Sequence, residues 1–184
     1  MNPSEQERWQ PHLRNEWVIL RPLREGDRED LLEVASDPLI WEQHPAKERS
    51  TPSGFHTFFD ESIRSGGAML ILDSATRKVI GSSRYQIRPE WVEMVEIGWT
   101  FLSRQYWGGT YNHAAKRLMI AHAFNYVGEV VLFIDCTNIR SQKAAIKIGA
   151  VETSNDALLA LLGKSQDTLI YKLFKDSWGV AKGV

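Results

Sequence analysis

The fold of this protein is decided by residues 96–111, which read EIGWTFLSRQYWGGTY. The first part of this stretch is the end of an apolar strand, Gly108 and Gly109 form a loop, and a helix over residues 111–127 follows. The free N–H groups and the positive dipole end of a helix N-terminus attract anions, and glycine lets an anion approach the backbone closely. Because Arg104 adds positive charge, the pattern predicts a phosphate-binding turn. A plain glycine turn between strand and helix is the alternative.

A second informative stretch, residues 138–150, reads NIRSQKAAIKIGA and follows a buried-type strand over residues 130–135. Asn138 is well suited to cap a helix here, and Ser141 falls in the first turn of that helix. The helix has a basic face, made by Arg140, Lys143 and Lys147. These charges either meet a ligand or are simply solvated, as surface lysines usually are.

The remaining sequence predicts a mixed α/β fold around one sheet. Short apolar or alternating runs predict strands, and caps with helical apolar spacing predict helices. The expected strands are residues 17–20, 68–73, 79–87, 92–101, 130–135 and 168–174. The expected helices are residues 27–35, 51–64, 111–127 and 138–148. The second, third and fourth strands follow one another closely, which predicts an antiparallel meander.

Composition limits the class of protein. A chain of 184 residues, 43% hydrophobic and 24% charged, can form one domain with its own core. We expect an N-terminal arm over residues 1–15, the domain over residues 16–178 and a C-terminal tail over residues 179–184. The net charge of −1 argues against a nucleic-acid partner. No apolar run reaches the roughly 20 residues of a membrane span, and the polar start does not read as a signal peptide, so no membrane partner is expected.

Cysteine and histidine usage excludes further classes. Cys136 is the single cysteine, so the chain has no disulfide framework and we expect a cytoplasmic location. Cys136 ends a buried-type strand, so it either lies near the site or is a small buried hydrophobic residue. The five histidines have no metal-ligand spacing, and no metal site is expected. The sequence also contains neither a G-x-S-x-G elbow nor a G-x-x-x-x-G-K-[ST] loop.

Together, the two stretches resemble the Gcn5-related N-acetyltransferases, the GNAT family. Residues 105–110 (QYWGGT) match the first two fixed positions of that family's acyl-CoA loop, Q/R-x-x-G-x-G/A. The EIGW run at residues 96–99, the N-x-x-S motif at residues 138–141 and the Gly-Ala pair at residues 149–150 resemble the branch of ribosomal-protein alanine N-acetyltransferases. The resemblance covers residues 17–174 with the spacing of the motifs intact.

The resemblance implies a single domain whose mixed sheet splays into a V between the fourth and fifth strands, with acetyl-CoA in the cleft. The pantetheine would pair with the fourth strand near residues 99–102, and the pyrophosphate would lie on the amides of residues 105–111. The residues implied for binding acetyl-CoA are Trp99, Phe101, Leu102, Arg104, Gln105, Trp107, Gly108, Gly109, Thr110, Tyr111, Asn138, Ser141 and Lys143.

The reaction that the resemblance implies is direct attack of a neutral amine on the acetyl thioester. Glu96 lies on the right strand to take the proton from the amine. Glu93 and Glu96 face opposite sides of a regular strand, however, and the sequence leaves open which one points inward. Glu96 is either this base or a carboxylate on the sheet surface. Ser141 is either the partner of the thioester sulfur or a simple first-turn serine.

Two positions depart from the family pattern. Thr110 stands where the loop has Gly or Ala, and because a β-branched residue resists positive φ, it requires ordinary helical geometry there. Ala145 stands where many family members carry a tyrosine acid. The hydroxyl groups that remain as proton donors are those of Ser141, Tyr111 and Tyr171, with solvent as a further source.

The expected function is therefore acetyl-CoA-dependent N-acetylation of a primary amine, on a small molecule or a protein N-terminus. A CoA-binding module without turnover and an enzyme for longer acyl donors are the alternatives. Trp41, with Phe55 and Phe59, either lines the acceptor pocket or packs in the core. Exposed aromatic residues near the C-terminus, Phe174 and Trp178, predict self-association to a homodimer.

Overall fold

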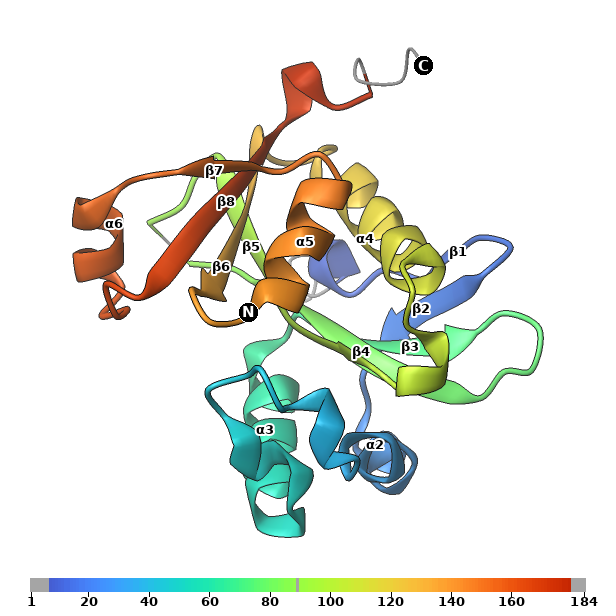
Figure 1. The fold of residues 1–184 in the computed structure, drawn as a ribbon. Coiled ribbons are helices and arrows are strands. Elements are labelled where there is room, and N and C mark those ends of the chain that lie inside the picture. The colour runs from blue at the N-terminus through green and yellow to red at the C-terminus, as the bar shows by residue number, and fades with distance from the viewer. Residues whose placement is uncertain (1–6, 89, 180–184) are drawn as a thin grey trace.

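The computed structural model describes residues 7–88 and 90–179 and has one open sheet at its centre (Figure 1). The strands are β1 (Leu13–Arg14), β2 (Val18–Pro22), β3 (Ala68–Asp73), β4 (Val79–Gln86), β5 (Met94–Leu102), β6 (Glu129–Asp135), β7 (Val151–Thr153) and β8 (Thr168–Phe174). The helices are α2 (Arg28–Ala35), α3 (Pro52–Ser65), α4 (Thr110–Ala123), α5 (Ile139–Lys147) and α6 (Asp156–Leu161). The mixed α/β class expected from the sequence is confirmed.

The strands follow the order β1-β2-β3-β4-β5-β6-β8-β7 across the sheet. Strands β3 to β5 form the antiparallel meander that the sequence predicts, and β2 extends it by pairing antiparallel with β3. Strands β5 and β6 are parallel, and β8 pairs antiparallel with β6 on one side and with β7 on the other. A parallel pair needs a long crossover connection, and α4 supplies it between β5 and β6.

The parallel pair opens soon after it begins. Residues 94–96 of β5 pair with residues 129–131 of β6, and the pairing ends there although both strands continue. In its next part β5 carries a bulge against β4, where the register shifts and Trp99 has a φ of 52°. A bulge bends the strand that carries it. The sheet therefore splays between β5 and β6, at the place that the resemblance implies.

Side chains alternate between two cores, one on each face of the sheet. On β3, Met69 and Ile71 belong to the core that α4 and α5 cover, whereas Leu70 belongs to the core beside α2 and α3. Figure 1 shows the two helix pairs on opposite sides of the sheet. Phe55 and Phe59 of α3 are fully buried in the second core. Of the two expectations for these phenylalanines, core packing is therefore the one observed.

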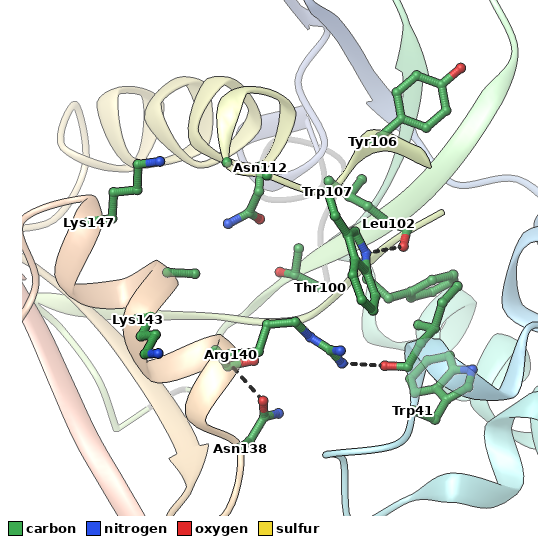
Figure 2. Close-up of a pocket in the computed structure, with 16 residues that line it drawn as sticks. Trp41, Thr100, Leu102, Tyr106, Trp107, Asn112, Asn138, Arg140, Lys143 and Lys147 are labelled. Atoms are coloured by element: carbon green, nitrogen blue, oxygen red, sulfur yellow. Dashed lines mark hydrogen bonds between the residues drawn. The ribbon is translucent and has the colours of Figure 1, made fainter. Parts of the chain in front are cut away.

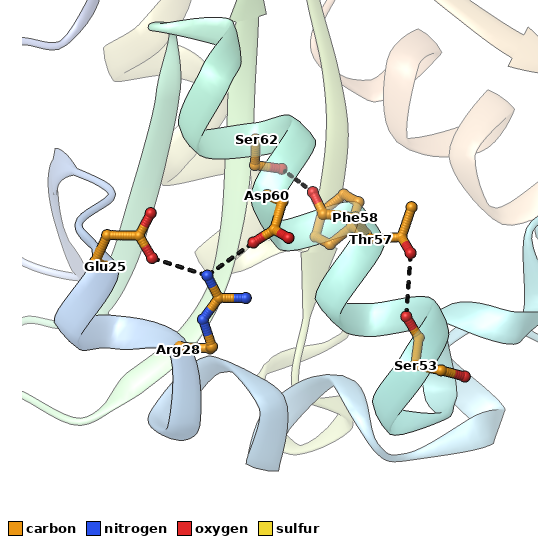
Figure 3. A network of polar contacts seen from close by, with 7 residues as sticks. All are labelled: Glu25, Arg28, Ser53, Thr57, Phe58, Asp60 and Ser62. Carbon is orange, nitrogen blue, oxygen red and sulfur yellow. Dashed lines mark hydrogen bonds and ion pairs between the residues drawn. The ribbon is translucent and has the colours of Figure 1, made fainter.

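An ion-pair bridge connects α2 with α3 (Figure 3). Arg28 Nη2 lies 2.8 Å from Glu25 Oε2 and 2.7 Å from Asp60 Oδ1, and the guanidinium lies 4.3 Å from the centre of the Phe59 ring. Because both carboxylates are largely exposed, each pair contributes less than about 1 kcal/mol to stability. The bridge fixes how the two helices lie beside each other more than it stabilises the fold.

Three local expectations are wrong. Trp9, in the expected loose arm, is buried in the core with 4% of its surface exposed. The helix expected over residues 111–127 ends at Ala123. Cys136 is exposed and not a buried hydrophobic residue, because β6 ends one residue earlier and the chain turns to the surface. Residues 1–6 of the expected arm and residues 180–184 of the expected tail lie outside the described residues.

Some short elements were not expected from the sequence. Strands β1 and β7 have two and three residues, and α6 has six. Elements this short carry too few residues for a periodic pattern.

Trp178, expected at a dimer face, packs against Phe124 of its own chain, with 5.7 Å between the ring centres. No helix in the described ranges is long and apolar enough to cross a membrane.

Candidate functional site

Two adjoining pockets occupy the cleft where β5 and β6 part. The first, shown in Figure 2, has a volume of about 290 Å³. The end of β5, the loop after it, the start of α4 and one face of α5 surround it. Its lining residues are Ile40, Trp41, Thr100, Phe101, Leu102, Tyr106, Trp107, Gly108, Gly109, Asn112, Asn138, Arg140, Ser141, Lys143, Ala144 and Lys147.

The glycine loop places a helix N-terminus at the first pocket. Gly108 and Gly109 have φ values of 98° and 113°, which other residues adopt only at a cost. Helix α4 then begins at Thr110, in the ordinary helical geometry expected of it, and no side chain of the described residues caps it. The amides of Tyr106 and Trp107 already donate to carbonyls of the preceding turn. The amides suited to an anion therefore start at Gly108, later than the expected start at residue 105.

Lysines of α5 reach toward the same loop. Lys143 and Lys147 both line the first pocket, and a Cβ placed on Gly109 would collide with Lys147 Nζ. The two lysines are four residues apart and so lie on one face of the helix. This spacing placed Lys147 on the expected basic face, but only the position of α5 across from the loop shows that it lines the pocket. Arg104 points elsewhere, with its Nε 2.5 Å from Asp37 Oδ2.

A tryptophan and an arginine form one wall of the first pocket (Figure 2). Trp107 Nε1 donates to the Leu102 carbonyl at 2.9 Å, which fixes the indole. The Arg140 guanidinium lies 4.1 Å from the centre of that indole ring, and Arg140 Nη2 donates to the Ile40 carbonyl at 2.6 Å. This contact ties α5 to the segment after α2. The segment also supplies Trp41, which is buried and lines both pockets.

The capping residue of α5 lies where the two pockets meet. Asn138 is buried, and its Oδ1 accepts from the Ser141 amide at 3.1 Å, which is the helix cap expected from the sequence. Asn138 and Ser141 line both pockets. The Ser141 hydroxyl has no hydrogen-bond partner among the described residues, so it is free to bond to a ligand.

The second pocket, of about 400 Å³, contains a buried amine. Lys116 of α4 is 6% exposed, and its Nζ donates to Thr100 Oγ1 at 2.6 Å. Thr100 Oγ1 also lies 2.7 Å from Ser83 Oγ. Burial lowers the pKa of Lys116 to about 7, although Glu96 opposes this shift. Sequence reasoning missed Lys116 and its neighbour Asn112, which lies one turn earlier on the same helix face.

Glu96 is the acidic residue that points inward. It is 3% exposed, whereas Glu93 is exposed in the loop before β5. Glu96 Oε1 lies 3.8 Å from Lys164 Nζ and Glu96 Oε2 lies 4.0 Å from Arg88 Nη2, but Oε2 has no hydrogen-bond partner among the described residues. Burial raises the pKa of Glu96, and nearby cations, Lys164 first, act against that rise. Glu96 itself does not line the second pocket, but Gly98 and Lys164 beside it do.

The other candidate hydroxyl groups lie away from the cleft. Tyr111 donates to Asp73 Oδ2 at 2.9 Å, and Tyr171 donates to Glu152 Oε2 at 3.0 Å. Neither tyrosine lines either of these two pockets.

The residues predicted to bind acetyl-CoA fall into three groups by the pocket that they line. The first pocket takes Phe101, Leu102, Trp107, Gly108, Gly109, Asn138, Ser141 and Lys143; Trp99 lines the second; and Arg104, Gln105, Thr110 and Tyr111 line neither.

The sequence matches the profile of a known family over residues 18–151, described as an acetyltransferase (GNAT) domain. This chain belongs to the GNAT acetyltransferase family. The fold agrees with that membership, because solved structures of acetyltransferases superpose on most of the chain. No curated protein matches it in sequence.

Three of these structures illustrate the shared fold of this GNAT acetyltransferase. A GCN5-related N-acetyltransferase from Brucella melitensis has a TM-score of 0.76 at 18% identity, covering 92% of this chain and 80% of its own. A GNAT-family acetyltransferase from Bacillus anthracis has a TM-score of 0.70 at 14% identity, and the superposition covers 90% of this chain and 99% of that protein. A Vibrio cholerae protein, provisionally described as a ribosomal-protein-serine acetyltransferase, has a TM-score of 0.68 at 15% identity. The superposition covers 89% of this chain and 97% of that protein.

Proposed function

We propose that this acetyltransferase transfers the acetyl group of acetyl-CoA to a primary amine by direct attack in a ternary complex. The observation that supports this most is that the two pockets share residues at the split between β5 and β6. The shared residues are Trp41, Thr100, Asn112, Asn138, Ser141 and Ala144. One pocket then suits a CoA thioester and the other an amine, with the reacting atoms at their junction.

The first pocket is proposed to hold acetyl-CoA. Its pyrophosphate would lie on the amides that start at Gly108, beside Lys143 and Lys147, because an anion is stabilised by both the helix dipole and positive charge. The pantetheine amides would pair with β5 beyond Glu96, where β6 has left the edge of the strand without a neighbour. The acetyl group would then point toward Ser141.

In the proposed reaction the ammonium group loses a proton, its nitrogen attacks the acetyl carbonyl carbon, and the C–S bond breaks. The sulfur leaves as a thiolate, which takes up a proton to give the CoA thiol. We propose Glu96 as the proton acceptor, through water that enters past Gly98, because its raised pKa brings the carboxylate closer to neutral pH. We propose that the Ser141 hydroxyl bonds to the departing sulfur.

Binding is tested first, by calorimetric titration with acetyl-CoA. We expect micromolar binding that Gly108→Asp abolishes, because the carboxylate repels the pyrophosphate and the residue strains a φ of 98°. Gly179→Asp is the matched control, because Gly179 has a φ of 97° and equally open surroundings but lies outside both pockets. Equal binding by all three proteins would contradict the proposed site.

Catalysis is tested by release of CoA thiol with a panel of primary amines. We expect Glu96→Gln to lower kcat about a hundredfold or more, since general bases contribute at least that much. Lys116→Met is the comparison, because Lys116 lines the second pocket and its pKa of about 7 lets its amine accept a proton at neutral pH. If Lys116→Met removes the pH dependence and Glu96→Gln does not, the base is Lys116. Binding of acetyl-CoA without thiol release for any amine would identify a binding module instead.

A further inference from the structure

Arg84 of β4 is a buried guanidinium without a hydrogen-bonded acceptor. It is 5% exposed, and its Nε is buried and unpartnered. None of its five N–H donors makes a hydrogen bond within the described residues. The guanidinium lies 3.5 Å from the centre of the Trp99 ring, and Arg84 pairs with Gly98 in the β4–β5 register. Trp99 and Gly98 line the second pocket, whereas Arg84 lies next to them and does not line it itself. A buried charge left in this state is costly unless an anion completes it.

A second arginine lies close by. Arg49 lines the second pocket, and its positive charge is near enough to oppose the protonation of Arg84. Burial lowers the pKa of Arg84 to about 10, and the charge of Glu96 opposes this shift more than Arg49 adds to it, so the group still carries its charge at neutral pH. Glu48 and Glu61 are exposed carboxylates in the same region, but neither forms an ion pair with either arginine within 4.0 Å among the described residues.

The charges that line the second pocket are mainly positive. Arg49 and Lys164 line it as cations and Lys116, with a pKa of about 7, is partly protonated at neutral pH, with Asp135 as the opposing carboxylate among the lining residues. Asp135 Oδ1 already accepts from the amide and the hydroxyl of Thr137. Glu96, behind the wall, partly balances Lys164 but does not reach hydrogen-bond distance of it. The pocket therefore has cationic donors in excess of its carboxylates.

We propose that the acceptor carries an anionic oxygen group, a carboxylate or a phosphate, beside its reacting amine, that Arg49 binds this group, and that the charge of Arg84 behind Trp99 attracts it into the pocket. The inference rests on the proposed function and narrows it to one class of acceptor. Guanidinium groups bind carboxylate and phosphate oxygens through paired N–H donors. A pocket of about 400 Å³ has the size of a small-molecule site, which favours a small zwitterionic amine over a protein N-terminus.

The first test compares amines that differ only in the anionic group. Linear amino acids of increasing length are assayed beside their carboxamides, and 2-aminoethyl phosphate beside 2-aminoethanol, each with acetyl-CoA. We expect at least one acid to exceed its neutral partner about tenfold or more in kcat/KM, the size of a charge-assisted hydrogen bond. A preference among the amino acids identifies a carboxylate site, and a preference for 2-aminoethyl phosphate identifies a phosphate site. Acetylation of the neutral partners with equal efficiency would overturn the inference while leaving the proposed function intact, as would a preference for peptide N-termini.

The second test links the preference to the arginines. Arg84→Met removes the guanidinium and keeps an unbranched apolar side chain next to Trp99, and Arg49→Met tests the second guanidinium if the first variant does not fold. We expect either change to lower kcat/KM for the acid about tenfold more than for its neutral partner, whereas a purely structural defect would lower both equally. Arg64→Gln, an exposed position on α3, is the control that keeps the preference. An unchanged preference in both folded methionine variants would overturn the assignment.

A third measurement does not depend on turnover. Calorimetric titration of the same acids and amides in the presence of CoA reports binding even if no amine in the panel is acetylated. Binding of an acid but not of its amide, lost in Arg84→Met, supports the inference whatever the fate of the proposed reaction. Absence of binding by every acid in the panel overturns it.

Discussion

Replacing Lys116 by methionine will change how the stability of the protein depends on pH. Methionine has a similar length and no charge, so it fills the same space without the amine. The pKa of Lys116 falls from an ordinary 10.5 to about 7 because the amine is buried. At about 1.4 kcal/mol for each pKa unit, the difference corresponds to roughly 5 kcal/mol between the two protonation states.

The sign of the effect follows from where the proton resides. Between about pH 7 and pH 10.5 the unfolded chain keeps the proton on Lys116 and the folded protein releases it, so stability rises with pH. Below about pH 7 both states are protonated, and this contribution no longer changes. From about pH 7 to about pH 9 the wild-type protein should therefore gain about 2 to 3 kcal/mol relative to Lys116→Met.

Urea unfolding of both proteins at the two pH values measures this difference directly. The hydrogen bond from Lys116 to Thr100 is lost in the variant at both pH values, so comparing the two conditions largely removes its contribution. Lys175→Met, at an exposed position, is the control and should follow the wild type. A gap between wild type and Lys116→Met that stays constant within about 0.5 kcal/mol would refute a lowered pKa.

Two further changes test the loop and the core. Gly109→Ala should weaken acetyl-CoA binding more than Gly108→Ala, because both glycines have positive φ but only a methyl group at position 109 collides with Lys147 Nζ. Calorimetric titration of both variants checks this, and equal losses would show that the position of Lys147 is unimportant. Tyr85→Phe removes a buried hydroxyl that donates to the Met119 carbonyl at 2.8 Å, and should cost about 1 kcal/mol in urea unfolding. Unchanged stability would mean that this carbonyl finds another donor.

Local signals were enough for most of the fold. Strand β8 begins and ends at the residues that alternation indicates, and Asn138 caps α5 as its side chain and position predict. The end of α4 was misjudged by four residues, because the apolar run after Ala123 continues into the core without helical geometry. Strand β1 was missed because its two residues are held by pairing with β2, and nothing in its own sequence demands an extended conformation.

Only part of the candidate site could be predicted from the sequence. Gly108 and Gly109 adopt positive φ values, which glycine allows in any context, so the loop could be predicted from the sequence. Which of Glu93 and Glu96 points inward could not be predicted from the sequence, because it depends on where β5 begins and which strands cover it. Lys147 was separable from a solvated lysine only once α5 was known to lie across the cleft from the loop.

The order of the longer elements, the antiparallel meander, the glycine loop and the family could all be predicted from the sequence. Each of these rests on caps, periodicity or backbone preference, which act over a few neighbouring residues. Tertiary structure alone decided that Lys116 donates to Thr100, that Arg84 is buried against Trp99, and that the pockets meet at Ser141. Burial and charge depend on residues brought together from distant parts of the chain, so desolvation and pKa exist only in the folded protein.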